Sequence, residues 1–141
     1  MGYDEHFAGG EAGSVSSINY VKNGIAGMLE NVPREKLIGG VPFYTRLWTE
    51  AGDGTITSKA MGIAEEKRWV DNNQVELTWQ ADTAQYYGEV QTSDGAQFLW
   101  MEEERSLKEK MNVIRQNDLA GVACWKLGFE DSAAWDSIQW N

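Results

Sequence analysis

Apolar positions in the first third of the chain predict a strand, a helix and a second strand. Residues 1–4 have the character of the end of a strand. In residues 18–31 the apolar positions recur at helical spacing, with Ser16 or Ser17 as a suitable N-cap. Residues 37–43 form an almost continuous apolar run, which is typical of a strand buried on both faces. This order predicts a strand–helix–strand unit and therefore a parallel sheet.

The middle third changes to an antiparallel pattern. Residues 57–71 predict a helix, and residues 75–79 alternate between apolar and polar positions. Residues 84–90 and 97–101 also alternate, and residues 93–95 (SDG) predict a turn between them. We therefore expect a small α+β insertion within an otherwise parallel pattern.

The last third returns to the first pattern, and no internal repeat is found. We expect a helix at residues 102–117, a buried strand at 119–127 and a short closing helix at 132–138. The chain therefore falls into the α/β class, in three successive segments. These are residues 1–48, residues 49–101 (the insertion) and residues 102–141.

Composition narrows the fold and the partners. The 141 residues suffice for one domain, but a complete (β/α)8 barrel needs roughly 200–250 residues. The net charge of −10 argues against nucleic acid or an anionic membrane as partner, whereas neutral polysaccharide remains compatible. The single cysteine excludes an internal disulfide, and no signal peptide is visible. Seven tryptophans are an excess suited to packing or to stacking on sugar rings.

Three segments place polar or aromatic residues directly after an apolar run. They are residues 1–6 (MGYDEH), 37–46 (LIGGVPFYTR) and 121–131 (GVACWKLGFED). In a parallel α/β barrel the carboxyl ends of the strands are where chemistry is built. In this order, and with the insertion between the second and third, the segments resemble glycoside hydrolase family 18, whose best-known members are chitinases. They look closest to the bacterial spore and cell-wall branch, which trims N-acetylglucosamine-containing glycans.

The resemblance implies a fold and a set of site residues. The fold would be the C-terminal part of a (β/α)8 TIM barrel, strands six to eight, with a small α+β insertion. In this family the substrate's own acetamido oxygen attacks the anomeric carbon. By resemblance, Tyr3 and Asp4 are the catalytic residues: the Tyr3 hydroxyl donates to that oxygen, and Asp4 orients the sugar. Trp125 would form the floor under the ring. The other expected sugar contacts are Arg46, Tyr44 and Trp48.

Each of these residues also has a purely structural interpretation. Tyr3 and Trp125 could simply be packed, Asp4 could cap the following loop, and Arg46 could pair with one of the many acids. His6 has no partner at metal-ligand spacing and is interpreted as a loop residue, and Glu5 as a weaker substrate-contact candidate. Nothing in the sequence indicates a metal or an organic cofactor. The residues expected to serve packing alone are Cys124, Trp69, Trp79, Trp100, Trp135 and Trp140.

The sequence departs from the family in one large respect. The family's D-x-x-D-x-D-x-E run, whose Glu is the proton donor, does not occur; residues 102–104 (EEE) are interpreted as a favourable charge at a helix start. We therefore expect a C-terminal half that is inactive alone and that recruits another copy or a missing N-terminal half. The parent protein would act outside the cell, at the cell wall or spore surface. The alternatives are a non-catalytic carbohydrate-binding fragment and an unrelated α/β domain that matches by chance.

Overall fold

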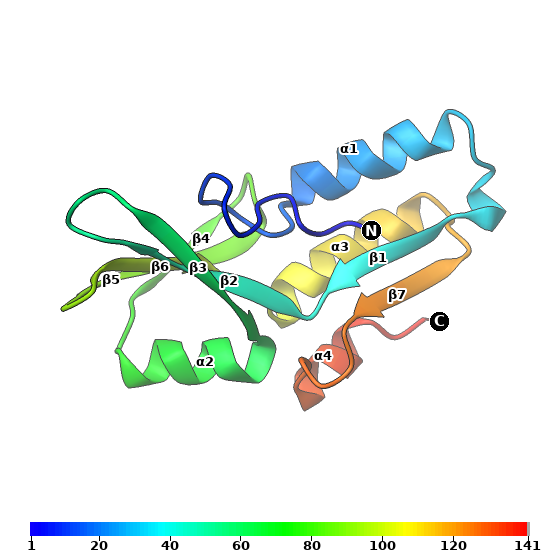
Figure 1. The fold of residues 1–141 in the computed structure, drawn as a ribbon. Coiled ribbons are helices and arrows are strands. Elements are labelled where there is room, and N and C mark those ends of the chain that lie inside the picture. Colours follow the sequence, from blue (N-terminus) through cyan, green and yellow to red (C-terminus); the bar gives the residue numbers. More distant parts are fainter. Residues whose placement is uncertain (141) are drawn as a thin grey trace.

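A computed structural model describes residues 1–140. Within them the chain forms two parts that lie side by side (Figure 1). One part has a two-stranded parallel sheet covered by helices, and the other has a five-stranded antiparallel sheet with one helix on its lower face. The expected mixture of a parallel unit and an α+β insertion is therefore observed.

The parallel sheet pairs β1 (Ile38–Pro42) with β7 (Gly121–Trp125), from Ile38 opposite Gly121 to Pro42 opposite Trp125. The N-terminal segment runs alongside β1, and the Gly2 amide donates to the Gly40 carbonyl at 3.0 Å. This bond aligns residues 1–4 with β1 but does not make a strand of them, so the predicted strand end is an irregular segment that runs beside β1. The carboxyl ends of β1 and β7 and the N-terminal segment point to the same end of this part.

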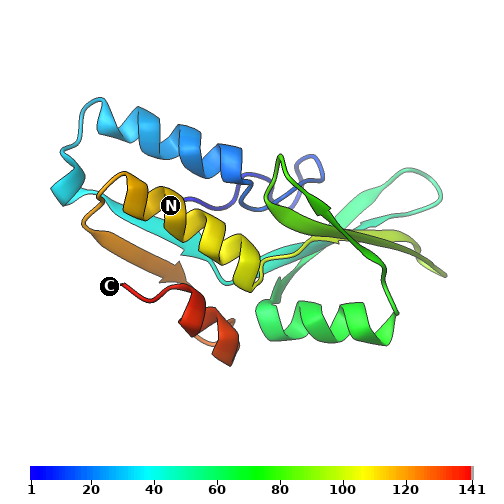
Figure 2. The same cartoon turned by 180° about the vertical axis from the view of Figure 1, so that it is seen from behind.

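Three helices complete the parallel part: α1 (Ile18–Leu29), α3 (Glu104–Gln116) and α4 (Ser132–Ser137). A short 3₁₀ turn, η1 (Arg34–Lys36), leads into β1. Figure 2 shows α3 lying over the two strands and α1 running alongside α3. The core between them is apolar, and a Cβ added at Gly39 would lie 2.6 Å from Ile114 Cδ1 of α3. Glycine at this position therefore allows the helix to approach the strand closely.

The antiparallel sheet has the strand order β3-β2-β6-β5-β4. Its helix, α2 (Ile63–Asn72), covers one face through an apolar cluster that includes Leu47, Val70 and Leu99. Because side chains alternate along a strand, Tyr44, Arg46 and Trp48 lie on the opposite face of β2 from Leu47. The strands are β2 (Tyr44–Glu50), β3 (Ile56–Gly62), β4 (Leu77–Gln80), β5 (Gln85–Thr92) and β6 (Gly95–Trp100).

Two sequence expectations in this region are corrected. The helix predicted from residue 57 begins only at Ile63, because residues 56–62 form β3 and pair with β2 along their whole length. A tight turn closes this hairpin, with the Gly54 amide donating to the Ala51 carbonyl at 2.9 Å. Strand β2 itself was not predicted, and the expected segment boundary between residues 48 and 49 falls inside it. The β2–β3 hairpin is stabilised by pairs of residues on different strands, and the spacing of apolar residues within one segment does not predict such pairs.

The boundaries of α1 and α3 follow from their caps. Ser17 Oγ accepts from the Tyr20 amide at 3.1 Å, which confirms Ser17 as the N-cap of α1. Glu103 caps α3 in a reciprocal arrangement with Ser106. Residues 102–104 were expected to act through their negative charge at the helix start. One of them, Glu103, in addition forms a specific N-cap.

Candidate functional site

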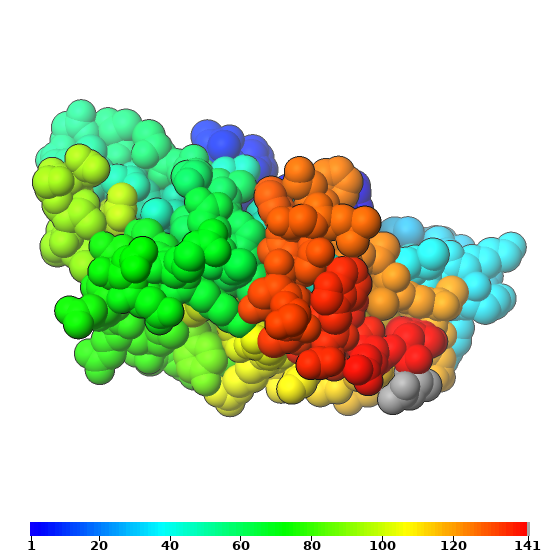
Figure 3. Space-filling view, turned by 90° about the horizontal axis from the view of Figure 1, so that it is seen from below, coloured from blue at the N-terminus to red at the C-terminus, as the bar shows by residue number. Residues whose placement is uncertain are grey.

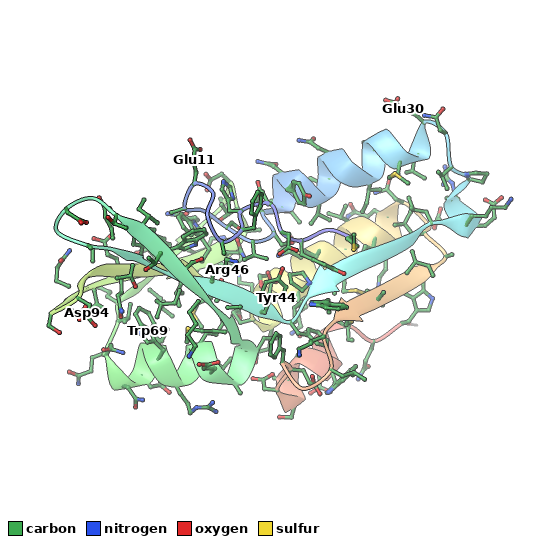
Figure 4. The ribbon with its side chains drawn as sticks, viewed as in Figure 1. Glu11, Glu30, Tyr44, Arg46, Trp69 and Asp94 are labelled. Carbon is green, nitrogen blue, oxygen red and sulfur yellow. The ribbon has the colours of Figure 1, made fainter. Side chains whose placement is uncertain are left out.

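The carboxyl ends of the two parallel strands and the N-terminal segment bring several of the expected site residues together. Trp125 is the last residue of β7, and its carbonyl accepts from the Phe43 amide at 2.6 Å. Tyr44 opens β2 immediately afterwards, and Figure 4 labels it at the point where the two sheets meet. Tyr3 and Asp4 reach the same place from the N-terminal segment.

Three aromatic rings meet there. The Tyr3 ring stacks with the Trp125 indole, with centroids 6.4 Å apart and planes inclined by 25°. The Tyr3 ring also meets the Tyr44 ring edge to face, at 6.3 Å and 71°. Trp125 remains 54% exposed, so one broad apolar surface faces solvent. Tyr3, Asp4, Tyr44 and Trp125 are called the strand-end cluster below.

A hydrogen bond ties Asp4 into this cluster, because the buried Tyr44 hydroxyl donates to Asp4 Oδ1. Asp4 has a φ of 61°, in the left-handed region that Asp tolerates better than most residues. Burial raises the pKa of Tyr44, and the bond to Asp4 and the Asp4 charge raise it further. Burial and the same charge also raise the pKa of Tyr3. Both phenols are therefore protonated donors at neutral pH.

Arg46 lies two residues beyond Tyr44 on the same face of β2 (Figure 4). Its Nη1 donates to Ser58 Oγ of β3 at 3.0 Å. Its Nε is buried and, within residues 1–140, has no hydrogen-bond partner. No acidic side chain pairs with Arg46 in this part of the chain, so the ion-pair interpretation does not describe it.

The expectation for Trp48 is corrected by its burial. Its side chain is 1% exposed, and its indole Nε1 donates to the Gly13 carbonyl at 2.9 Å. The loop of residues 5–17 crosses over this part of β2, so Trp48 belongs to the core and offers no face to a ligand.

Sequence comparison identifies the family to which this geometry belongs. The model of glycosyl hydrolases family 18 matches residues 1–130. The chain belongs to this family.

Similar proteins include several from Bacillus. The uncharacterized glycosylase YvbX of Bacillus subtilis is 28% identical over 140 residues, covering 99% of this chain and 40% of YvbX. The cortical fragment-lytic enzyme of the same organism is 26% identical over 137 residues, covering 96% of this chain and 32% of the enzyme. The family 18 chain thus spans less than half the length of these relatives.

Solved structures share the fold. The chitinase of Chromobacterium violaceum superposes with a TM-score of 0.89 at 22% identity, covering 98% of this chain and 43% of the chitinase. The spore cortex-lytic enzyme SleL of Bacillus megaterium gives 0.85 at 24% identity, with coverages of 98% and 32%. The two parts of the family 18 chain are therefore arranged as in larger enzymes of this fold.

The loop after the strand-end cluster is fixed by its own side chains. The Glu5 carboxylate accepts from the Ser17 amide at 2.7 Å and from Ser17 Oγ at 3.0 Å. His6 Nδ1 donates to the Ser14 carbonyl at 2.8 Å. His6 is thus a loop residue as expected, and Glu5 stabilises the start of α1 in this family 18 chain.

Other polar candidates lie away from the cluster or are inactive. Burial, assisted by the charge of Glu130, raises the pKa of Cys124 to about 11, so its thiol is not a nucleophile at neutral pH. Across residues 1–140, no three His, Cys, Asp or Glu side chains are grouped to hold a metal ion. Among the helices in the same range, none is long and apolar enough to cross a membrane.

Sequence reasoning missed a second polar group in this family 18 chain. A group of fully buried polar residues lies between the start of α2, the start of β5 and the first half of α3. It consists of Glu66, Gln85, Glu102, Ser106 and Lys110, and is called the junction cluster below. The i, i+4, i+8 spacing of Glu102, Ser106 and Lys110 was a usable signal, since it places one acid, one hydroxyl and one amine along one face. Glu66 carried no such signal.

Proposed function

We propose that this chain forms one side of the sugar-binding cleft of a glycosidase that acts on β-1,4-linked N-acetylglucosamine glycans, chitin or peptidoglycan. The observation that carries the proposal is the strand-end cluster, in which Tyr3, Asp4, Tyr44 and Trp125 converge from three separate segments. Family 18 membership supports the reaction class. The names of the chitinases and cortex-lytic enzymes that share the fold support the substrate class.

Trp125 would be the floor of the cleft. An exposed indole presents a flat apolar face, which suits the apolar face of a pyranose ring. The stacked Tyr3 ring holds the indole from one side, so that its orientation is fixed before any sugar binds.

Tyr3 and Asp4 would support substrate-assisted, retaining hydrolysis. In this scheme the acetamido oxygen of the substrate attacks its own anomeric carbon, so positive charge develops on the acetamido group. The protonated Tyr3 hydroxyl would donate to that oxygen and hold it in line. The Asp4 carboxylate, oriented by Tyr44, would face the developing charge.

Arg46 and Tyr44 would line the wall formed by β2. The guanidinium offers a rigid fork of donors, which Ser58 Oγ holds through Nη1. A sugar hydroxyl at the Tyr44 end of β2 would accept from the outer nitrogens of this fork, since the Nε is buried.

The proton donor would come from polypeptide outside this sequence. General acid catalysis typically contributes about 10²–10⁴-fold to the rate. The chain alone is therefore expected to bind glycans without cleaving them. If its natural role is binding alone, it is the non-catalytic carbohydrate-binding fragment that the sequence leaves as the alternative.

The parallel part has surfaces suited to further polypeptide. Its sheet has only two strands, and a groove of about 520 Å³ runs between α1 and β1, lined in part by Val21, Ile25 and Gly39. We expect another copy of the chain or an N-terminal half to cover these surfaces and close the barrel, the described strands then being its strands six to eight. Light scattering at high concentration should detect self-association, and a clean monomer would count against this expectation. The complete protein would act outside the cell, at the cell wall or spore surface.

Titration with an N-acetylglucosamine tetramer tests the proposal. Trp125→Ala should abolish the fluorescence change and weaken binding by about tenfold or more, because the stacking face for the sugar is lost. Trp140→Ala is the matched control, because Trp140 is similarly exposed but follows α4. Equal binding by wild type and Trp125→Ala would refute the proposed cleft. Reproducible hydrolysis of a chromogenic oligomer by the wild-type chain would refute the assignment of the proton donor to other polypeptide.

A further inference from the structure

The junction cluster lies where the antiparallel part meets the parallel part. Figure 3 shows α2 beside the segment after β7 and α4, with α3 adjoining them from below. The Ile63 amide, at the start of α2, donates to the Phe129 carbonyl at 2.7 Å. The side chains of Glu66, Glu102 and Lys110 are all 0% exposed in the region between the two parts.

Glu102 is fully supplied with partners. Lys110 Nζ lies 3.0 Å from each of its carboxylate oxygens. Ser106 Oγ donates to Oε1 at 2.7 Å, and Gln85 Nε2 donates to Oε2 at 3.1 Å. The ammonium of Lys110 and two neutral donors stabilise the carboxylate form of Glu102. Of the two buried acids, Glu102 and Glu66, Glu102 therefore carries the negative charge.

Glu66 is supplied poorly by comparison. Its Oε2 accepts from the Glu102 amide at 3.2 Å, whereas its Oε1 is buried with no partner among residues 1–140. A buried carboxylate with one weak donor and no cation would be very costly, whereas a neutral carboxylic acid would not.

The charges around Glu66 also favour its neutral form. From the residues directly before α3, the carboxylates of Glu102 and Glu103 act on Glu66. On its own helix, Lys67 is held by Glu104 and Asp131 at 2.5 and 2.6 Å. From β3, Lys59 pairs with the partly exposed Glu65 at 2.6 Å. The charged residues of β2, Arg46 and Glu50, lie on the opposite face of the sheet.

We propose that Glu66 is the uncharged member of the junction cluster, and that its ionisation as the pH rises loosens the contact between α2 and the segment that leads into α3. Burial, followed by the charges of Glu102 and Glu103, raises the pKa of Glu66 well above its ordinary value, although the Glu102 amide and Lys67 oppose this. The stabilising effect of a neutral Glu66 is complete below the pKa of an unfolded glutamate, about 4.3. It is lost as pH rises through the raised value of the folded chain.

A loosening of α2 would affect the strand-end cluster through the backbone pairing of β3 with β2. Gly62, which directly precedes α2, pairs with Tyr44, and the Phe129 ring lies 6.3 Å from the Tyr44 ring. A shift of α2 therefore moves the strand end that holds the Tyr44 hydroxyl against Asp4. Coupling between the junction cluster and any sugar site rests on the proposed function, but the ionisation of Glu66 does not.

Unfolding of the complete 141-residue chain in urea, between about pH 5 and about pH 9, tests the ionisation. Relative to Glu66→Gln, which is neutral at every pH and equal in size, the wild-type folding constant should fall by up to about tenfold per pH unit. Glu65→Gln is the matched control on the same helix and should parallel wild type. Parallel curves for wild type and Glu66→Gln would overturn the proposal.

Two measurements extend the test. In wild type, infrared spectroscopy at neutral pH should show the carbonyl band of a buried protonated carboxylic acid, and its absence would overturn the proposal without any variant. Glu66→Gln should lack this band. At alkaline pH, amides of α2 should exchange faster in wild type than in Glu66→Gln, and equal exchange would overturn the loosening. These readouts involve no sugar, so failed glycan binding would count only against the proposed function.

Discussion

Replacing Lys110 with methionine should destabilise the chain far more than its small change in volume suggests. The ammonium is fully buried and lies 3.0 Å from both oxygens of an equally buried Glu102. Methionine retains most of the buried stem and removes the charge, which leaves the Glu102 carboxylate without its cation. Removing one partner of a buried ion pair costs about 3–5 kcal/mol. For a chain of this length that corresponds to a fall in Tm of about 10–20 °C.

The loss should depend on pH. Burial raises the pKa of Glu102 even with Lys110 and Ser106 opposing it, so removing the ammonium raises that pKa further. Below the unfolded pKa a lone Glu102 is protonated in both states and costs little. The destabilisation therefore grows as pH rises, and thermal melts at mildly acidic and neutral pH measure this trend.

A matched control and a double variant complete the test. Lys108 lies on the exposed face of α3, so Lys108→Met should change the free energy of unfolding by less than about 0.5 kcal/mol. The double variant Glu102→Gln, Lys110→Met removes both charges and should recover most of the loss. If Lys110→Met is as stable as wild type, or the double variant is no better than the single one, the interpretation of the buried pair is wrong.

Two further changes probe packing and the strand-end cluster. Gly39→Ala should lower the free energy of unfolding by about 1–3 kcal/mol, measured in urea, because the new Cβ would lie 2.6 Å from Ile114 Cδ1. Tyr44→Phe removes the hydroxyl that donates to Asp4, and a hydrogen bond to a charged acceptor contributes about 1.5–3 kcal/mol. Its melts should show a loss within or just below that range, and proton NMR should show a changed environment for Asp4.

Both variants, Gly39→Ala and Tyr44→Phe, have a matched control in α1. Gly24→Ala adds a Cβ with nothing within 4 Å and should stabilise the exposed helix by about 0.5–1 kcal/mol. Equal effects of Gly24→Ala and Gly39→Ala would contradict the steric argument. Tyr20 is exposed, so Tyr20→Phe should be nearly neutral. A loss as large as that of Tyr44→Phe would show that the bond to Asp4 is not its cause.

The sequence predicted best where local chemistry decides the structure. Ser17 and the apolar spacing after it define α1 because the cap and the helical face lie within one short segment. The family resemblance is confirmed, because the model of family 18 matches residues 1–130. The roles assigned to Tyr3 and Asp4 remain predictions. Their meeting with Tyr44 supports those roles, but it does not test them.

The sequence predicted least where contacts between distant segments determine the structure. The helical pattern at residues 57–62 gives way to β3 because β2 offers a complete set of cross-strand partners. Trp48 was expected to contact the sugar, but a loop about thirty residues or more earlier in the sequence covers it. Glu66 was not singled out from the sequence, and its burial depends on a segment about 36 residues away, whose Glu102 amide donates to it.

Phe43 alone separates β1 from β2, and it is fully buried. The polypeptide thus passes from one sheet to the other with no slack, so the two sheets must turn together rather than hinge at this point. Extra residues inserted beside Phe43 should disrupt both sheets at once. The hairpin end at Gly54, which has open space around it, is the better place to attach a fluorophore or a foreign loop.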